Sequence, residues 1–195
     1  MIDIPPPPPA PAQQIEAISR CGIPAEKITV SNEAELQSEV VSISDAGEVT
    51  EQKWVCLLDA VHPFYSLQLE DPGQRASFYE VEQRERQKRA RAESTAWLRA
   101  RGMLDRVPPY ERGSDISAFA RAVEEACSIP TGTMLQAKGD HLTFRRDAPA
   151  RLIGDGATDK LACLMHVMFA SNAPGSGMMF GIVGNDRVSP DGETP

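Results

Sequence analysis

The stretch from Gln74 to about Arg101 most constrains what this chain can fold into. It is rich in charged residues, contains no proline and is followed by Gly102, a residue that commonly ends helices. Its apolar residues form only a thin stripe, made by Phe78, Val81, Trp97 and Leu98. A helix with such a narrow apolar face buries little of its surface. We therefore predict one long polar helix, with the core built mainly by the segments around it.

Those surrounding segments predict an α+β fold with a small mixed sheet and additional helices. Apolar or alternating runs predict strands at 26–30, 53–61, 64–69 and 178–184, and a hairpin over 133–145 that turns at 138–140. Helical spacing predicts helices at 13–21, at 116–127 after a Ser114 or Asp115 cap, and after a Thr158 cap. Residues 32–43 fit either a helix capped by Asn32 or an alternating strand.

Both ends of the chain are predicted to be extensions of a single domain. Five consecutive prolines, Pro5–Pro9, fix the backbone and lack amide donors, so residues 1–12 form a proline-rich arm. That arm is either a stiff disordered segment or a docking peptide for an aromatic groove. Residues 185–195 are polar and are predicted to be a flexible tail. Residues 13–184 then form one domain, with no internal repeat at a period of 20–50 residues.

The cysteines predict the compartment. Cys21, Cys56, Cys127 and Cys163 form no Cys-x-x-Cys pair and no framework typical of secreted proteins, so a reducing cytoplasm is the simplest setting. The longest apolar run, Leu161 to Ala170, is about half as long as a membrane span. We therefore predict a soluble cytoplasmic protein without a transmembrane segment.

The charge of the chain is unevenly distributed. The net charge is −8, but residues 81–121 carry ten bases and six acids. An acidic total argues against wrapping nucleic acid over the whole surface, and it permits one local basic face. That face is predicted on the run RERQKRAR, with Arg84, Arg86, Lys88, Arg89 and Arg91 as DNA-phosphate contacts. The alternative is a solvated helix face without a ligand.

A candidate phosphate site precedes the basic run. In HPFYSLQLEDPGQRASFY, residues 62–79, a strand is followed by an acidic turn with a glycine and then by an arginine. Gly73 and Gln74 would offer backbone N–H groups at a helix start, and Arg75 a bidentate contact to phosphate. Glu70 and Asp71 could hold Mg²⁺ or activate water. In the alternative, these two acids neutralise the helix end and pair with Arg75.

The order of several short motifs suggests a family. The matching residues are Ile23, Pro24, Lys27 and Ile28 in a first strand, Ser42, Ile43 and Gly47 at the end of a second element, and Tyr65, Gly73, Arg75 and Ala76 around the turn. This order resembles the ParB/sulfiredoxin fold family over about residues 22–101. The resemblance implies a sheet of that type, followed by the long basic helix.

The resemblance also implies a function. Such a protein would act on nucleotide or DNA phosphates as an ATPase or nuclease with Mg²⁺ and ATP, with Glu70, Asp71 and Arg75 as its catalytic residues. Within that superfamily the chain is similar to plasmid fertility-inhibition factors of the oncogenic-suppression type. These inhibit conjugative DNA transfer near a type IV secretion coupling protein, through which this chain would be membrane-associated. The second hypothesis is a non-catalytic protein-binding accessory or inhibitor protein of a plasmid or phage.

Overall fold

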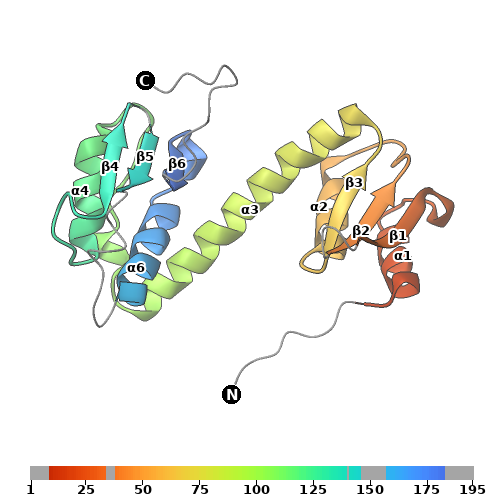
Figure 1. Cartoon of the computed structure of the whole chain (residues 1–195), viewed down its shortest axis with the longest axis horizontal. Coiled ribbons are helices and arrows are strands. Elements are labelled where there is room, and N and C mark those ends of the chain that lie inside the picture. The colour runs from red at the N-terminus through yellow and green to blue at the C-terminus, as the bar shows by residue number, and fades with distance from the viewer. Residues whose placement is uncertain (1–8, 34–37, 140, 146–156, 183–195) are drawn as a thin grey trace. The chain divides into compact units, whose positions relative to one another are not determined.

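The structure, a computed structural model, describes residues 9–33, 38–139, 141–145 and 157–182 (Figure 1). The chain divides into two compact units, residues 1–86 (unit 1) and 87–195 (unit 2), which differs from the predicted single domain. Both are built from helices and a small sheet, so the α+β class is confirmed. The predicted long helix is also confirmed as α3, Pro72–Ala100, which contributes residues to both units. Most of the proline-rich arm and the whole predicted tail lie outside the described residues.

Unit 1 has the order helix, strand, strand, helix, strand. Strand β1 runs antiparallel to β2, and β3 runs parallel to β2, so the sheet order is β1-β2-β3. Strand β3 therefore lies at one edge of the sheet (Figure 1). The elements are α1 (Pro11–Ser19), a short 3-10 helix η1 (Ala25–Lys27), β1 (Ile28–Glu33), β2 (Ser38–Ile43), α2 (Glu51–Val61) and β3 (Tyr65–Leu69).

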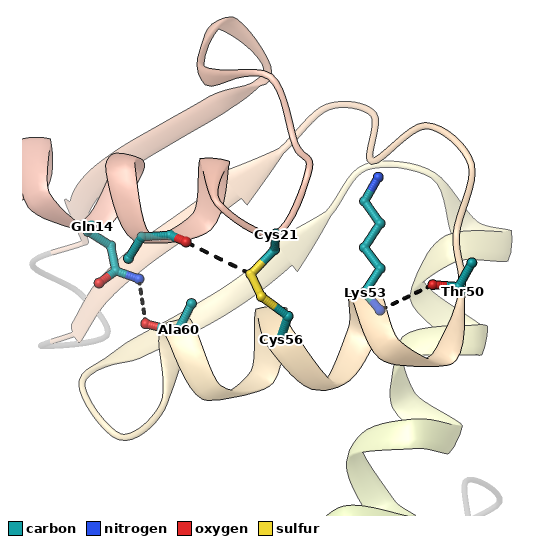
Figure 2. Close-up of a disulfide and its surroundings, with 7 residues drawn as sticks. Gln14, Cys21, Thr50, Lys53, Cys56 and Ala60 are labelled. Atoms are coloured by element: carbon teal, nitrogen blue, oxygen red, sulfur yellow. Dashed lines mark hydrogen bonds between the residues drawn. A yellow bond between two sulfur atoms is a disulfide. The ribbon is translucent and has the colours of Figure 1, made fainter.

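Helix α2 corrects the prediction of a strand at 53–61. Its buried residues are Trp54, Leu57, Leu58 and Val61, which have the i, i+3, i+4, i+7 spacing of one helix face. The Thr50 side chain caps the helix by accepting a hydrogen bond from the Lys53 N–H (Figure 2). Since 53–61 is helical, β3 is not its hairpin partner and instead pairs with β2. The strand alternative for 32–43 is confirmed over β2.

The core of unit 1 lies between its helices and one face of its sheet. Ile28, Ile43 and Leu69 are neighbours across the three strands and are buried together with helix residues such as Ile18 and Leu57. The next residues along the strands alternate to the opposite face, as side chains in strands do. These are polar residues, including Thr29, Ser42 and Gln68. The sheet therefore has one apolar face and an opposite face that is mostly polar, with Val40 as a buried apolar residue on it.

Unit 2 repeats the element order of unit 1. Strand β4 is antiparallel to β5, and β6 is parallel to β5, giving the sheet order β4-β5-β6. The predicted hairpin is confirmed, as is the Asp115 cap, whose carboxylate accepts hydrogen bonds from the N–H groups of Ser117 and Ala118. The elements are η2 (Leu104–Arg106), α4 (Ile116–Ala126), β4 (Leu135–Lys138), β5 (His141–Phe144), α6 (Ala157–Ala170), η3 (Pro174–Ser176) and β6 (Met179–Ile182).

Each unit contains a disulfide between its two helical segments. Cys21, just after α1, is bonded to Cys56 in α2 (Figure 2), and Cys127, at the end of α4, is bonded to Cys163 in α6. The partners are separated by 35 and 36 residues. The prediction that the cysteines form no framework is therefore wrong. Each bond joins residues from two distant elements, and no short-range spacing in the sequence reveals such a pair.

The two units also share short sequence motifs. Residues 21–24 read CGIP and residues 127–130 read CSIP, while 53–58 read KWVCLL and 160–165 read KLACLM. In both units the residue after the first cysteine has a positive φ, 81° at Gly22 and 55° at Ser128. These matches are about 106 residues apart. The molecule thus repeats one structural unit at a period well above the 20–50 residues predicted to hold no repeat.

Candidate functional site

The predicted phosphate turn is a capped helix start. The Asp71 carboxylate accepts a hydrogen bond from the Gln74 N–H at 2.7 Å, and the Asp71 carbonyl accepts one from the Arg75 N–H. A Cβ on Gly73 would lie 3.2 Å from the Asp71 carboxylate oxygen, so the glycine leaves room for this cap. A carboxylate of the chain itself therefore occupies the place where the sequence predicted a bound anion.

Gln74 connects α3 to the loop after β2. Its side-chain oxygen accepts from the Ala46 N–H at 3.0 Å, and its side-chain nitrogen donates to the Asp45 carboxylate and to the Gly47 carbonyl. The Gly47 N–H, and then the Gln74 side chain, lower the pKa of Asp45 below its ordinary value. Both ends of the Gln74 amide are thus engaged within the protein.

Arg75 lies in the first turn of α3, is exposed, and reaches the end of β3 with its guanidinium. Its Nε and Nη2 groups donate to the Leu69 carbonyl at 3.1 and 2.8 Å. Among the described residues it forms no salt bridge with Glu70 or Asp71, so the predicted pairing with these acids does not account for its position. Because two of its donors are fixed on Leu69, the guanidinium is held at the sheet edge with further N–H groups available.

The hydrogen bonds around β3 show which backbone groups face its free side. The Glu70 N–H donates to Ile43 of β2, whereas the Leu69 carbonyl accepts from Arg75. Successive residues of a strand direct their N–H and C=O groups to opposite sides. The backbone groups of Ser66 and Gln68 therefore face β2, and those of Leu67 and Leu69 face away from it. No described strand pairs with that outer side.

A hollow of about 430 Å³ adjoins β3 and also reaches Ser42 of β2. Glu70 and Arg75 both line it, so the structure brings two of the predicted site residues together. Its other lining residues, Ser42 and Leu67 to Leu69, are not among the predicted site residues. The alternation of YSLQL predicts a strand, but that β3 is an edge strand follows from its pairing with β2, which is a long-range feature.

The predicted DNA-contact residues lie on α3. Arg84 forms an ion pair with Glu51 at 3.0 Å, and Arg86 forms one with Glu82 at 2.6 Å. Lys88 and Arg89 also make interactions, and Arg91 is exposed. Exposed pairs of this kind contribute about 0–1 kcal/mol and exchange readily with solvent. The pairs fit a solvated helix face, and the DNA contact stays a prediction.

Three findings complete the description of the site. Within the described part of the chain, no group of three or more His, Cys, Asp or Glu side chains could hold a metal ion. None of the described helices combines the length and apolar character needed to cross a membrane. Comparisons with family models, curated proteins and solved structures found no match to the chain.

Proposed function

We propose that this chain is a non-catalytic binding protein that accepts an extended segment of a partner protein as an additional strand beside β3. The observation that carries the proposal is the free edge of β3 with the hollow alongside it. Unpaired N–H and C=O groups on an edge strand are a template for another strand. Peptide-binding domains use such edges, where backbone hydrogen bonds give affinity and side-chain contacts give specificity.

The edge has a defined length and end. Leu67 offers both of its backbone groups to an incoming strand, and Leu69 offers its N–H. The Leu69 carbonyl is already bonded to Arg75, so the added ladder would end there. The remaining guanidinium N–H groups of Arg75 favour a carboxylate on the partner segment at this end.

The two disulfides favour an oxidising compartment over the predicted cytoplasm, because cytoplasmic thiols are normally kept reduced. Labelling of free thiols in protein taken directly from its native cell distinguishes the two. An oxidising compartment predicts no reactive cysteine without prior reduction. Four reactive cysteines would support the cytoplasmic prediction.

A phosphate-handling enzyme of the ParB/sulfiredoxin type is the second candidate, supported by Glu70 and Arg75 lining one hollow. Its weakness is that Asp71 and Gln74 are engaged in capping and loop contacts. It predicts Mg²⁺-dependent ATPase or nuclease activity that Glu70→Gln and Arg75→Ala both abolish. Activity absent from the wild type, or unchanged in both variants, would reject it.

The strand-docking proposal is tested by selecting peptides from a displayed random library on the full chain. Leu67→Pro removes the N–H that faces the free edge, while the bonds to β2 come from Ser66, Gln68 and Glu70 and are retained. Leu67→Ala is the matched control, because it loses the side chain and keeps the N–H. Loss of one backbone hydrogen bond is expected to weaken binding about fivefold.

The readout is the dissociation constant of enriched peptides by fluorescence anisotropy, after circular dichroism has shown that both variants are folded. The proposal expects weaker binding by Leu67→Pro than by Leu67→Ala, because both lose the side chain and only the first loses the N–H. It would be rejected if no peptide were enriched, or if enriched peptides bound the two variants equally well.

A further inference from the structure

Unit 2 has an open sheet edge of its own at β4. The Arg145 N–H donates to the Met134 carbonyl, which continues the β4–β5 ladder by one pair. The Met134 carbonyl and the backbone groups of Gln136 therefore face β5, and the backbone groups of Leu135 and Ala137 face away. No described strand pairs with β4 on that outer side. Strand β4 is thus an edge strand of unit 2, as β3 is of unit 1.

A buried carboxylate fixes the start of this second edge. Glu124 is 0% exposed, and one of its oxygens accepts from the N–H groups of Met134 and Leu135 at 2.7 and 2.8 Å. The other oxygen accepts from the Gly132 N–H. Glu124 thus satisfies the first outward N–H of β4, as a strand carbonyl would. The Leu135 carbonyl and both backbone groups of Ala137 remain directed outward.

A hollow of about 240 Å³ adjoins the same edge. Besides β4, it is lined by two arginines, Arg121 from α4 and Arg145 after β5, and by the hydroxyl residues Ser117 and Thr131. Among the described residues that line it, Glu124 is the one acid, and its oxygens are occupied by three backbone N–H groups. Arg145 already makes an interaction of its own, so the guanidinium that the hollow offers is that of Arg121, together with the two hydroxyl groups. These are partners that a carboxylate prefers.

The charge of unit 2 suits the same class of ligand. Residues 87–195 carry 14 Lys and Arg against 13 Asp and Glu, whereas residues 1–86 carry 6 against 15. An acidic segment is therefore repelled much less by unit 2 than by unit 1. The hollow is smaller than an ordinary small-molecule site, which suits one or two side chains of a bound strand.

We propose that β4 and the adjoining hollow form a second docking site, which takes an extended acidic peptide and holds a carboxylate against Arg121. This site is carried by unit 2 alone, so it does not depend on the proposed role of β3. If both proposals hold, one chain binds two extended segments, one on each unit.

The test uses ¹⁵N-labelled full-length protein and three synthetic nonapeptides in which threonine alternates with glutamate, glutamine or lysine. Nuclear magnetic resonance detects weak binding and locates it. The proposal expects the glutamate peptide to shift the amide signals of Leu135 to Ala137 and of Arg121. The glutamine and lysine peptides should bind at least about tenfold more weakly, because they lack the charge-assisted contact.

Variants of Arg121 and Ala137, each with a matched control, sharpen the assignment. Arg121→Gln should weaken binding of the glutamate peptide about tenfold, whereas Arg99→Gln, an exposed arginine of unit 2 outside the hollow, should leave it unchanged. Ala137→Pro should weaken binding of the glutamate peptide, because the outward N–H of residue 137 is lost. Ala137→Ser keeps that N–H and is the control. Leu67→Pro, which changes β3 of unit 1, should leave this binding unchanged. Shifts confined to β3, no shifts, equal binding of the glutamine peptide, or equal effects of the two arginine variants would overturn the proposal.

Discussion

Units 1 and 2 have the same element order and equivalent disulfides, yet they differ three residues before the first cysteine. Unit 1 has Ile18 there and unit 2 has Glu124, and both side chains are 0% exposed. Ile18 packs in an apolar core, whereas Glu124 accepts three backbone N–H groups from the following loop and β4. One fold accommodates either residue, because the carboxylate is buried only together with its hydrogen-bond donors.

Each unit contains one of the two tryptophans, Trp54 in unit 1 and Trp97 in unit 2. Replacing either tryptophan by phenylalanine leaves fluorescence that reports on the other unit alone. The unfolding of the two units in guanidinium can therefore be followed separately within the full chain, and the predictions below use this readout.

The largest expected effect is loss of a disulfide. The double variants Cys21→Ala/Cys56→Ala and Cys127→Ala/Cys163→Ala should each lower the free energy of unfolding of their own unit by about 3–4 kcal/mol, because the unfolded chain regains the freedom of a similar loop. Near-equal losses would show that the two disulfides stabilise their units by the same amount. A loss in only one unit would show that packing alone stabilises the other unit, and that its disulfide adds little to the free energy of unfolding.

An intermediate effect is expected at Glu124. Glu124→Gln replaces one accepting oxygen by a donor group that faces an N–H, so unit 2 should lose about 2–3 kcal/mol of unfolding free energy, measured through Trp97. Glu125→Gln, an exposed neighbour, should change it by less than about 0.5 kcal/mol. If Glu124→Gln and Glu125→Gln changed the unfolding free energy equally, the buried carboxylate of Glu124 would contribute nothing special to the stability of unit 2.

The smallest effect is a pH dependence in unit 2. His166 stacks on Trp97 at a ring distance of 4.4 Å, and Arg101 also lies over that ring. Burial, and then Arg101, lower the pKa of His166, while Glu93 opposes them. The unfolded chain therefore binds this proton more readily than the folded one, with a pKa of about 6.5.

The stabilising contribution of neutral His166 is then complete above about pH 6.5 and is lost as the pH falls below it. His166→Phe keeps an aromatic ring and should remove this small loss, measured through Trp97 between pH 7.5 and 5.5. Unit 1, measured through Trp54, should be unaffected by the substitution. An unchanged pH slope in the variant would assign the dependence to other groups.

Local signals predicted much of this fold, and their failures have identifiable causes. The Asp115 cap, the hairpin over β4 and β5 and the long helix α3 each depend on residues close in sequence, and all are confirmed. The strand predicted at 53–61 is wrong because the nearly continuous apolar run was given more weight than its helical spacing. Thr50, a preferred N-cap residue, was the overlooked sign of a helix.

The candidate site was predictable only in part. Asp71 followed by Pro72 is a common start of a helix, so the capping alternative was already visible in the sequence. The position of Arg75 depends on the Leu69 carbonyl, and the openness of β3 depends on which strand pairs with it. Strand order is a long-range property, and the periodicity of a single segment does not contain it.

We expect the central part of α3 to open more readily than its two ends. Phe78 and Val81 near its start belong to the core of unit 1, and Leu98 near its end belongs to that of unit 2, while residues 82–93 belong to neither. Most helices fray at their ends, but here amide exchange should be fastest in the middle. That segment carries five lysine or arginine residues, so trypsin should cleave there first. Both fragments would keep their own disulfide, and each could then be studied alone.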